Sequence, residues 1–165
     1  MRRGDPSYGG TMISLRPLTI ADLDLACRHR ERMFTESGRP PEAIAVMVPA
    51  FREWLEPRLV DGRYSGFVVE TEAGEPIGGM GMMEIDWPPH PFHPTEGRRG
   101  YVLNIYVEPG HRRRGHARRM MAAAEAEFER RGLTYAVLHA TEAGRPLYEQ
   151  LGWEPTAEMA RRLAC

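Results

Sequence analysis

The feature that most constrains the fold is a strand-like run that stops at a proline and leads through a basic turn into a helix. Residues 101–117 read YVLNIYVEPGHRRRGHA. The β-branched and aromatic residues of 101–107 predict a strand, which Pro109 ends. Apolar residues recur at helical spacing from about 114 to 131, and Gly132 marks the end of that expected helix.

The junction between this strand and this helix has the local chemistry of an anion-binding site. The first N–H groups of a helix have no internal partners, and the helix dipole makes this end partly positive. Gly115 has no Cβ, so a bulky anion can approach the backbone. Ala117 keeps the next turn small, and three arginines add positive charge: Arg112, Arg113 and Arg114.

A solvated basic turn or a nucleic-acid contact is the alternative interpretation of these arginines. The whole chain has 22 basic and 23 acidic residues and a formal net charge of −1. Such a balance gives no support for a partner that is held by phosphate electrostatics. We therefore expect no nucleic-acid partner.

The remaining patterns indicate one domain with a single mixed sheet. Residues 1–11 have no periodicity and are expected to be a flexible extension, with one domain over 12–165. Further strands are expected at 13–16, 64–70, 77–86 and 133–140, and a last extended segment from Gly152. Further helices are expected from Thr19, over 42–59 with a break or kink near Pro49, and over 143–151. Late strand–helix–strand alternation argues for a parallel crossover, hence an α/β or α+β class.

The first of these helices has a clear start and a clear buried face. Thr19 is expected to be its N-cap, with Asp22 as the acidic partner three residues later. Ala26, Cys27 and Arg30 continue the helix at helical spacing.

The lack of long apolar segments and the small number of cysteines indicate where the protein is expected to work. No stretch is long and apolar enough to cross a bilayer, and the N-terminus lacks the apolar run of a signal peptide. The two cysteines are too few for a disulfide framework or a metal knuckle. We therefore expect a cytoplasmic protein without a membrane partner.

Two motifs and the opening segment resemble one known family. The spacing Arg112-x-x-Gly115-x-Ala117, between a strand and a long helix, is similar to the acetyl-CoA signature of GCN5-related N-acetyltransferases. Residues 144–153 (GRPLYEQLGW) resemble that family's Leu-Tyr-Glu-x-Leu-Gly-aromatic segment, and residues 14–19 (SLRPLT) its first strand. The resemblance implies a mostly antiparallel sheet, splayed at its centre, with helices on both faces. It also implies transfer of the acetyl group of acetyl-CoA to an amine.

The resemblance assigns roles to matching residues. The backbone of 112–117, including His116, would hold the pyrophosphate. Backbone N–H groups of Ile105, Tyr106 and Val107 would bind the pantetheine arm and stabilise the oxyanion. Thr141 stands where relatives often carry an asparagine that contacts the pantetheine. Tyr148 matches a tyrosine that lies near the sulfur and can protonate the departing thiolate.

A general base is needed as well, because an ammonium group cannot attack a thioester. The central strand carries no carboxylate, and Asn104 is its polar member. Glu84 is the first candidate because its strand is expected to lie beside the central one. Asp86, two histidines, Glu96 or a bound water remain alternatives.

The proline-rich segment 87–99 supplies those two histidines. Trp87, His90, Phe92 and His93 are expected to form a stiff aromatic lid over the acceptor pocket, and an inert surface loop is the alternative. Two histidines without a third ligand at usable spacing rarely bind a metal ion, so no metal is expected.

The expected activity is direct transfer from acetyl-CoA to a primary amine in a ternary complex. Two other classes stay open: a non-catalytic acyl-CoA-binding or sensing module, and an acetyltransferase for protein or peptide amines. The sequence leaves open the acceptor, the acyl-chain preference and whether the protein forms a homodimer.

Overall fold

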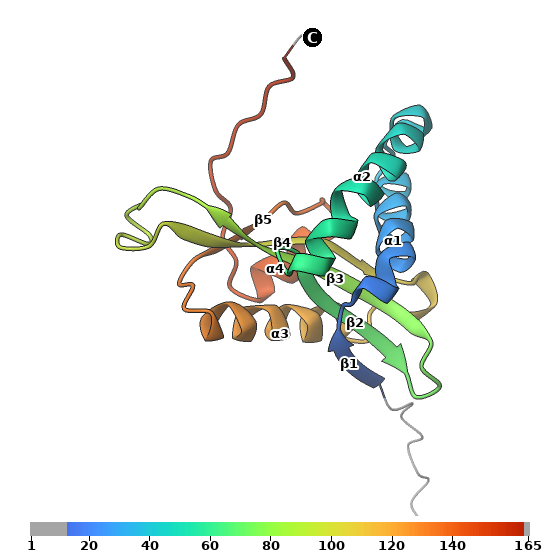
Figure 1. Ribbon diagram of the computed structural model, residues 1–165. Helices are drawn as coiled ribbons and strands as arrows, with labels where there is room; N and C mark the ends of the chain where they lie inside the picture. The colour runs from blue at the N-terminus through green and yellow to red at the C-terminus, as the bar shows by residue number, and fades with distance from the viewer. Residues whose placement is uncertain (1–12, 164–165) are drawn as a thin grey trace, which may run out of the picture.

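The computed structural model describes residues 13–163, which form a five-stranded sheet with helices around it (Figure 1). The strand order is β1-β2-β3-β4-β5, antiparallel except for the parallel pair β4–β5. The strands are β1 (Ile13–Pro17), β2 (Ser65–Thr71), β3 (Pro76–Asp86), β4 (Arg98–Val107) and β5 (Ala136–Leu138). The α-helices are α1 (Leu23–Glu36), α2 (Pro41–Asp61), α3 (His116–Arg130) and α4 (Arg145–Gln150). Short 3₁₀ turns are η1 (Ile20–Asp22) and η2 (Pro109–His111).

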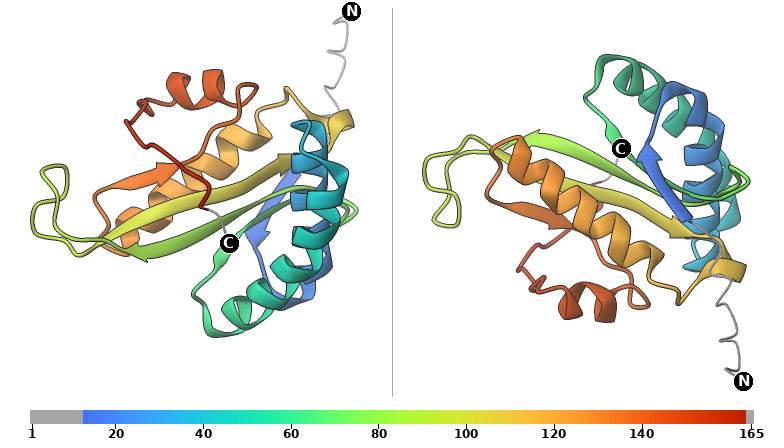
Figure 2. Two further views of the ribbon diagram at one scale, coloured as in Figure 1. Left: turned by 90° about the horizontal axis from the view of Figure 1, so that it is seen from above. Right: turned by 90° about the horizontal axis from the view of Figure 1, so that it is seen from below.

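Helices cover both faces of the sheet, as the family resemblance implied. The pair α1 and α2 lies on one face and α3 on the other (Figures 1 and 2). Met120, Met121 and Phe128 of α3 are buried in one core cluster with residues of three strands: Val69, Ile77, Met80, Met82 and Val102. A second cluster forms where Phe51 and Leu55 of α2 meet α1. Two separate cores therefore hold the sheet between its helical layers.

The sheet is irregular at its centre in two places. The β3–β4 register shifts between Gly79 and Gly81, so that two residues of β4 oppose Met80. This is a β-bulge, which locally bends the strand and redirects its side chains. In addition, β4 pairs with β5 only from Gly100 to Val102. Beyond Val102 the two strands part, and the splay implied by the family resemblance is present.

Several local predictions are confirmed at the N-terminal end. Thr19 and Asp22 form a capping box, in which the Thr19 N–H donates to Asp22 Oδ2 at 2.8 Å. Arg16 donates to both carboxylate oxygens of Asp22 at 2.8 Å. Arginine hydrogen bonds and the Thr19 backbone lower the pKa of Asp22 despite its burial.

Of the break or kink expected near Pro49, the break is absent, since α2 is continuous through Pro49 and Pro57 and bends along its length (Figures 1 and 2). Two other boundary predictions are wrong. The strand expected at 133–140 is only Ala136–Leu138. The segment expected to extend from Gly152 forms no strand up to residue 163 and leads away from the sheet (Figure 1).

The expected flexible extension at 1–11 lies outside the described residues. Within the described part of the chain, no helix combines the length and apolar character that a membrane span requires.

Candidate active site

The bulge in β4 is centred on Asn104, which has a left-handed backbone (φ 55°). Its side chain is buried and bridges two elements: Nδ2 donates to the Tyr64 hydroxyl at 2.8 Å, and Oδ1 accepts from Arg30 of α1. Asparagine tolerates this backbone region better than most residues. The extra residue sends the consecutive side chains of Leu103 and Asn104 to the same face, toward α1 and α2.

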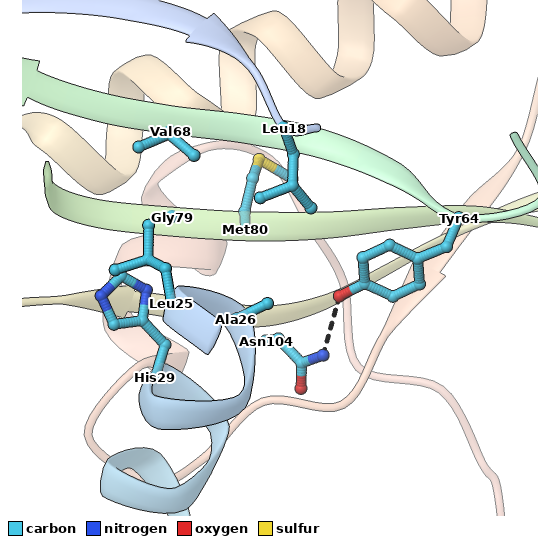
Figure 3. A pocket seen from close by; sticks show the side chains of 9 residues that line it. All are labelled: Leu18, Leu25, Ala26, His29, Tyr64, Val68, Gly79, Met80 and Asn104. Carbon is cyan, nitrogen blue, oxygen red and sulfur yellow. Dashed lines mark hydrogen bonds between the residues drawn. The ribbon is translucent and has the colours of Figure 1, made fainter. Parts of the chain in front are cut away.

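A small cavity lies behind the bulge, between α1 and the sheet (Figure 3). Its volume is about 10 Å³, the size of one water molecule. His29 closes one side of it and contacts Gly79, where a Cβ would lie 3.2 Å from His29 Nδ1. Burial lowers the pKa of His29 to about 4, so this imidazole is neutral at physiological pH.

Beyond the bulge, alternate backbone groups of β4 face the splay. The Glu108 N–H donates to Ile77 O on β3, and Tyr106 pairs with Gly79 of β3. Strand groups alternate in direction, so the N–H groups of Ile105 and Val107 point away from β3 into the splay. These two are suited to bind an amide-bearing ligand, whereas the backbone of Tyr106 faces β3.

The turn between β4 and α3 forms an anion cradle. Arg113 and Gly115 both have left-handed backbones, with φ of 60° and 82°. Left-handed residues within a turn direct neighbouring N–H groups toward one point. Among the described residues, no backbone hydrogen bond uses the N–H groups of 113–118. A Cβ on Gly115 would meet no atom within 4 Å, so the cradle is open.

The side chain of Arg112 has a structural task. Its Nε donates to Val107 O at 2.8 Å, and Nη2 contacts both carboxylate oxygens of Glu36 at 2.9 and 2.7 Å. Arg112 therefore ties the turn to β4 and α1 instead of pointing into the cradle. His116 is buried at the start of α3, and burial lowers its pKa. The cradle is thus built mainly from backbone.

Tyr148 lies in α4 and, like Ile105 and Val107, packs against the core cluster between α3 and the sheet. Burial raises the pKa of Tyr148, which keeps its hydroxyl protonated at neutral pH. Gly144 makes room for its ring, because a Cβ there would lie 3.1 Å from Tyr148 Cε2. The Thr141 hydroxyl accepts from the Gly144 N–H at 3.1 Å and so helps to start α4.

Two contacts fix α4 beside α3. Arg118 donates to Gln150 Oε1 at 3.2 Å, and Trp153 Nε1 donates to Glu125 Oε1 at 2.8 Å. They join α3, whose start belongs to the cradle, to the segment that carries Tyr148. The cradle, the splayed edge of β4 and the tyrosine therefore belong to one continuous site.

A cleft of about 490 Å³ opens on the other face of the sheet, between α2 and the strands. Side chains of α1, α2, β3 and β4 line it: Arg30, Met47, Ala50, Phe51, Trp54, Met83, Ile85, Tyr101 and Leu103. Its size is typical of small-molecule sites. Because it reaches Leu103 beside the bulge, it is a suitable entrance for a second substrate.

Glu84 does not face this cleft. Met83 and Ile85 line the cleft, and strand side chains alternate between faces, so Glu84 points to the face that carries α3. There it forms ion pairs with Arg98 and, at 3.5 Å, with Arg131. The position of Glu84 therefore argues against its expected role as the general base.

The proline-rich segment does not cover the cleft either. His90 and His93 form an isolated bridge, and Phe92 and His93 pack on Tyr135 at 5.6 and 5.4 Å between ring centroids. His93 is fully buried, with Nε2 2.9 Å from Arg99 Nη2. Arg99 in turn lies 4.2 Å from the ring of Trp87. The expected lid is a self-packed loop, and none of its four residues lines the cleft.

Sequence reasoning missed a chain of polar groups at the cleft edge. The Tyr101 hydroxyl contacts His139 Nδ1, and His139 Nε2 lies 3.2 Å from Glu158 Oε1. No spacing in the sequence joins these three residues, since the β4–β5 pairing brings Tyr101 to His139 and the segment after α4 brings Glu158. The role of Arg30 was missed too, although its position on the buried face of α1 was a usable signal.

The comparisons with known proteins agree with this geometry. The sequence model of the acetyltransferase (GNAT) family matches residues 26–153. A GCN5-related N-acetyltransferase from Ralstonia eutropha is 55% identical, with a TM-score of 0.90 over 92% of this chain and 99% of that one. A predicted acetyltransferase from Clostridium acetobutylicum, solved with acetyl-CoA, is 26% identical, with a TM-score of 0.82 over 92% of this chain and 96% of that one. No curated protein sequence matches the chain.

A more distant neighbour shares the fold alone. The aminoglycoside N-acetyltransferase AAC(6')-Iy, solved with CoA, is 18% identical, with a TM-score of 0.71 over 96% of this chain and 99% of that one.

The chain belongs to the GCN5-related N-acetyltransferase family. It is an acetyl-CoA-dependent N-acetyltransferase, and acetyl-CoA is its acyl donor. The residues present fit that donor, because the open cradle of unpaired N–H groups suits a pyrophosphate and the splayed edge of β4 suits its amide-bearing arm.

The cradle generates a direct test. We expect Gly115→Ala to weaken acetyl-CoA binding by about tenfold, because an alanine in a left-handed backbone costs about 1–2 kcal/mol and rotates the N–H groups. Isothermal titration with acetyl-CoA measures the change. Gly110→Ala is the matched control, since Gly110 has space for a Cβ and no positive φ. Equal affinities for the two variants would show that the cradle does not hold the donor.

Proposed function

We propose that the protein transfers the acetyl group of acetyl-CoA directly to a primary amine while both substrates are bound. The donor lies along the splayed edge of β4, with its pyrophosphate in the cradle at residues 112–117. The amine enters from the cleft between α2 and the sheet. The observation that carries this proposal is the bulge at Asn104, where the donor edge and the acceptor cleft meet within one strand.

Each part of the site has one task in this proposal. The N–H groups of Ile105 and Val107 face the donor and stabilise negative charge that develops on the carbonyl oxygen. Thr141 contacts the pantetheine arm near the start of α4. Tyr148 holds a proton that passes to the departing sulfur, and its raised pKa keeps that proton in place beforehand. Neither substrate has to leave before the other binds.

The first experiment separates the enzyme from a non-catalytic acyl-CoA-binding module. Acetyl-CoA at about 100 times its dissociation constant should stabilise the fold by about 2.7 kcal/mol, whereas ATP should not. Thermal unfolding measures this, and thiol release with a panel of small amines and peptides measures transfer. Binding without thiol release for any amine would favour the sensing module, and release with peptides alone would favour a protein or peptide acceptor.

Tyr148→Phe tests the acid. The variant keeps the packed ring and loses the hydroxyl, so we expect kcat to fall about 100-fold while KM for acetyl-CoA stays within about twofold. Steady-state thiol release measures both constants. Tyr135→Phe is the control, because that ring packs on the loop residue Phe92. An unchanged kcat for Tyr148→Phe would assign this tyrosine to packing alone.

We further propose that His139 accepts the proton of the amine through Tyr101. The Tyr101 hydroxyl lines the cleft, takes a proton from the ammonium group and passes its own proton to His139 Nδ1. Glu158, 3.2 Å from His139 Nε2, stabilises the imidazolium that results. This chain takes the place of Glu84, which faces the opposite side of the sheet.

His139→Gln tests this relay. We expect kcat to fall about 100-fold near neutral pH and the loss to shrink as pH rises, because more of the amine is then already deprotonated. A pH–rate profile measures the effect. His90→Gln is the control, since His90 lies in the loop outside the cleft. A loss that does not depend on pH, or an equal loss in the control, would contradict the relay.

A further inference from the structure

The cleft has an apolar wall with a single charged group. Phe51, Trp54 and Tyr101 supply aromatic surface, and methionine, isoleucine, leucine and alanine side chains complete the wall. Phe51 and Trp54 stack with ring centroids 5.9 Å apart. Arg30 is the one charged residue among the described residues that line the cleft, and no carboxylate lines it. This lining predicts an acceptor with an apolar or aromatic body.

Arg30 is held rigidly in the cleft wall. Its guanidinium carbon lies 4.8 Å from the ring centroid of Phe34 and 4.5 Å from that of Phe51. Its Nε contacts Met47 Sδ at 3.3 Å, and Nη1 donates to Asn104 Oδ1. These contacts fix the plane of the guanidinium and leave Nη2 without a partner among the described residues.

The charge of Arg30 lacks a counter-ion. Several other arginines reach carboxylates, as Arg16 does with Asp22 and Arg32 with Glu108. Within residues 13–163, Arg30 is within ion-pair distance of no carboxylate, and its polar partners are neutral. It is half-buried, and this burial lowers its pKa. A partly desolvated cation without a counter-ion is costly to the fold and attracts an anionic ligand group.

The same features disfavour polycationic acceptors. A polyamine or an aminoglycoside gains its affinity from carboxylates, and this cleft offers a cation and apolar surface instead. An uncharged aromatic amine would fill the apolar part but would leave the guanidinium without a counter-ion. An aromatic amine that also carries a carboxylate meets both requirements of the cleft. Its carboxylate can bind the guanidinium, and its aromatic body can cover Phe51 and Trp54.

We propose that the acceptor is an amino carboxylate with a large apolar side chain, of the class of the aromatic amino acids, whose carboxylate pairs with Arg30. This assignment rests on the proposed function, since it names the amine that enters the cleft. Transfer forms an amide bond between the amine nitrogen and the acetyl carbon and breaks the carbon–sulfur bond. The proton of the amine goes to the base at the cleft edge, and the sulfur receives its proton from Tyr148.

The test compares three amines that differ in one feature each. Phenylalanine has both the aromatic body and the carboxylate, phenethylamine lacks the carboxylate, and glycine lacks the body. We expect kcat/KM for phenylalanine to exceed that of either by at least about tenfold, the value of one charge-assisted hydrogen bond. Spermidine serves as the polycationic comparison. Thiol release measures the rates.

Arg30→Met links the preference to this residue. Methionine keeps contact with Phe34 and Phe51 and removes the charge, so the ratio of phenylalanine to phenethylamine should fall to within about twofold of one. Arg28→Met is the matched control, because Arg28 is an exposed arginine of the same helix outside the cleft, and it should keep the ratio. A thermal shift with acetyl-CoA confirms that each variant folds and binds the donor, and the ratio compares the two amines within one variant, so a weaker donor site alone does not change it.

A binding measurement separates this inference from the proposed function. In the presence of CoA, phenylalanine should raise the unfolding midpoint of the natural protein but not that of Arg30→Met. This shift without thiol release for any amine would refute transfer and leave the ligand assignment standing. Thiol release with spermidine or phenethylamine at rates equal to or above that of phenylalanine would overturn the ligand assignment and leave transfer standing. An unchanged ratio of phenylalanine to phenethylamine rates in Arg30→Met would also overturn the ligand assignment.

Discussion

The hydrogen bonds of Asn104 are the interaction on which the rest of the site depends. They hold an extra residue in β4 at a backbone conformation that few side chains adopt, by joining the strand to Arg30 of α1 and to Tyr64. Two consequences follow from that one residue. Leu103 reaches the acceptor cleft on one face, and the N–H groups of Ile105 and Val107 turn into the splay. Donor and acceptor sites are thereby set in a fixed relation.

The sequence was informative wherever the determinant is local. The strand that stops at Pro109, the glycine at the start of α3 and the capping box at Thr19 each depend on neighbours within a few residues, and the structure has all three. The anion cradle belongs to this group, because a left-handed Gly115 and free N–H groups follow from a turn that enters a helix. Family resemblance then supplied the splay, which no local pattern shows.

The remaining features depend on contacts between distant elements. Glu84 was expected to act from a neighbouring strand, but strand alternation sends it to the α3 face, where Arg98 and Arg131 bind it. The loop at 87–97 has a composition suited to a lid, yet the burial of His93 against Arg99 folds it on itself. Pro49 should interrupt a helix by propensity, and the burial of Phe51 and Leu55 in the second core outweighs that cost.

Arg30 connects the architecture of the site with its selectivity. One nitrogen of its guanidinium supports the bulge through Asn104, and another remains for a ligand. An apolar residue would serve the fold alone better at this half-buried position, because a partly desolvated cation without a counter-ion is costly. A residue that served binding alone could lie anywhere on the cleft rim. Arg30 contacts Asn104, so the guanidinium that recognises the acceptor also fixes β4, the strand that receives the donor. An acceptor bound to Arg30 is therefore aligned with the site of transfer.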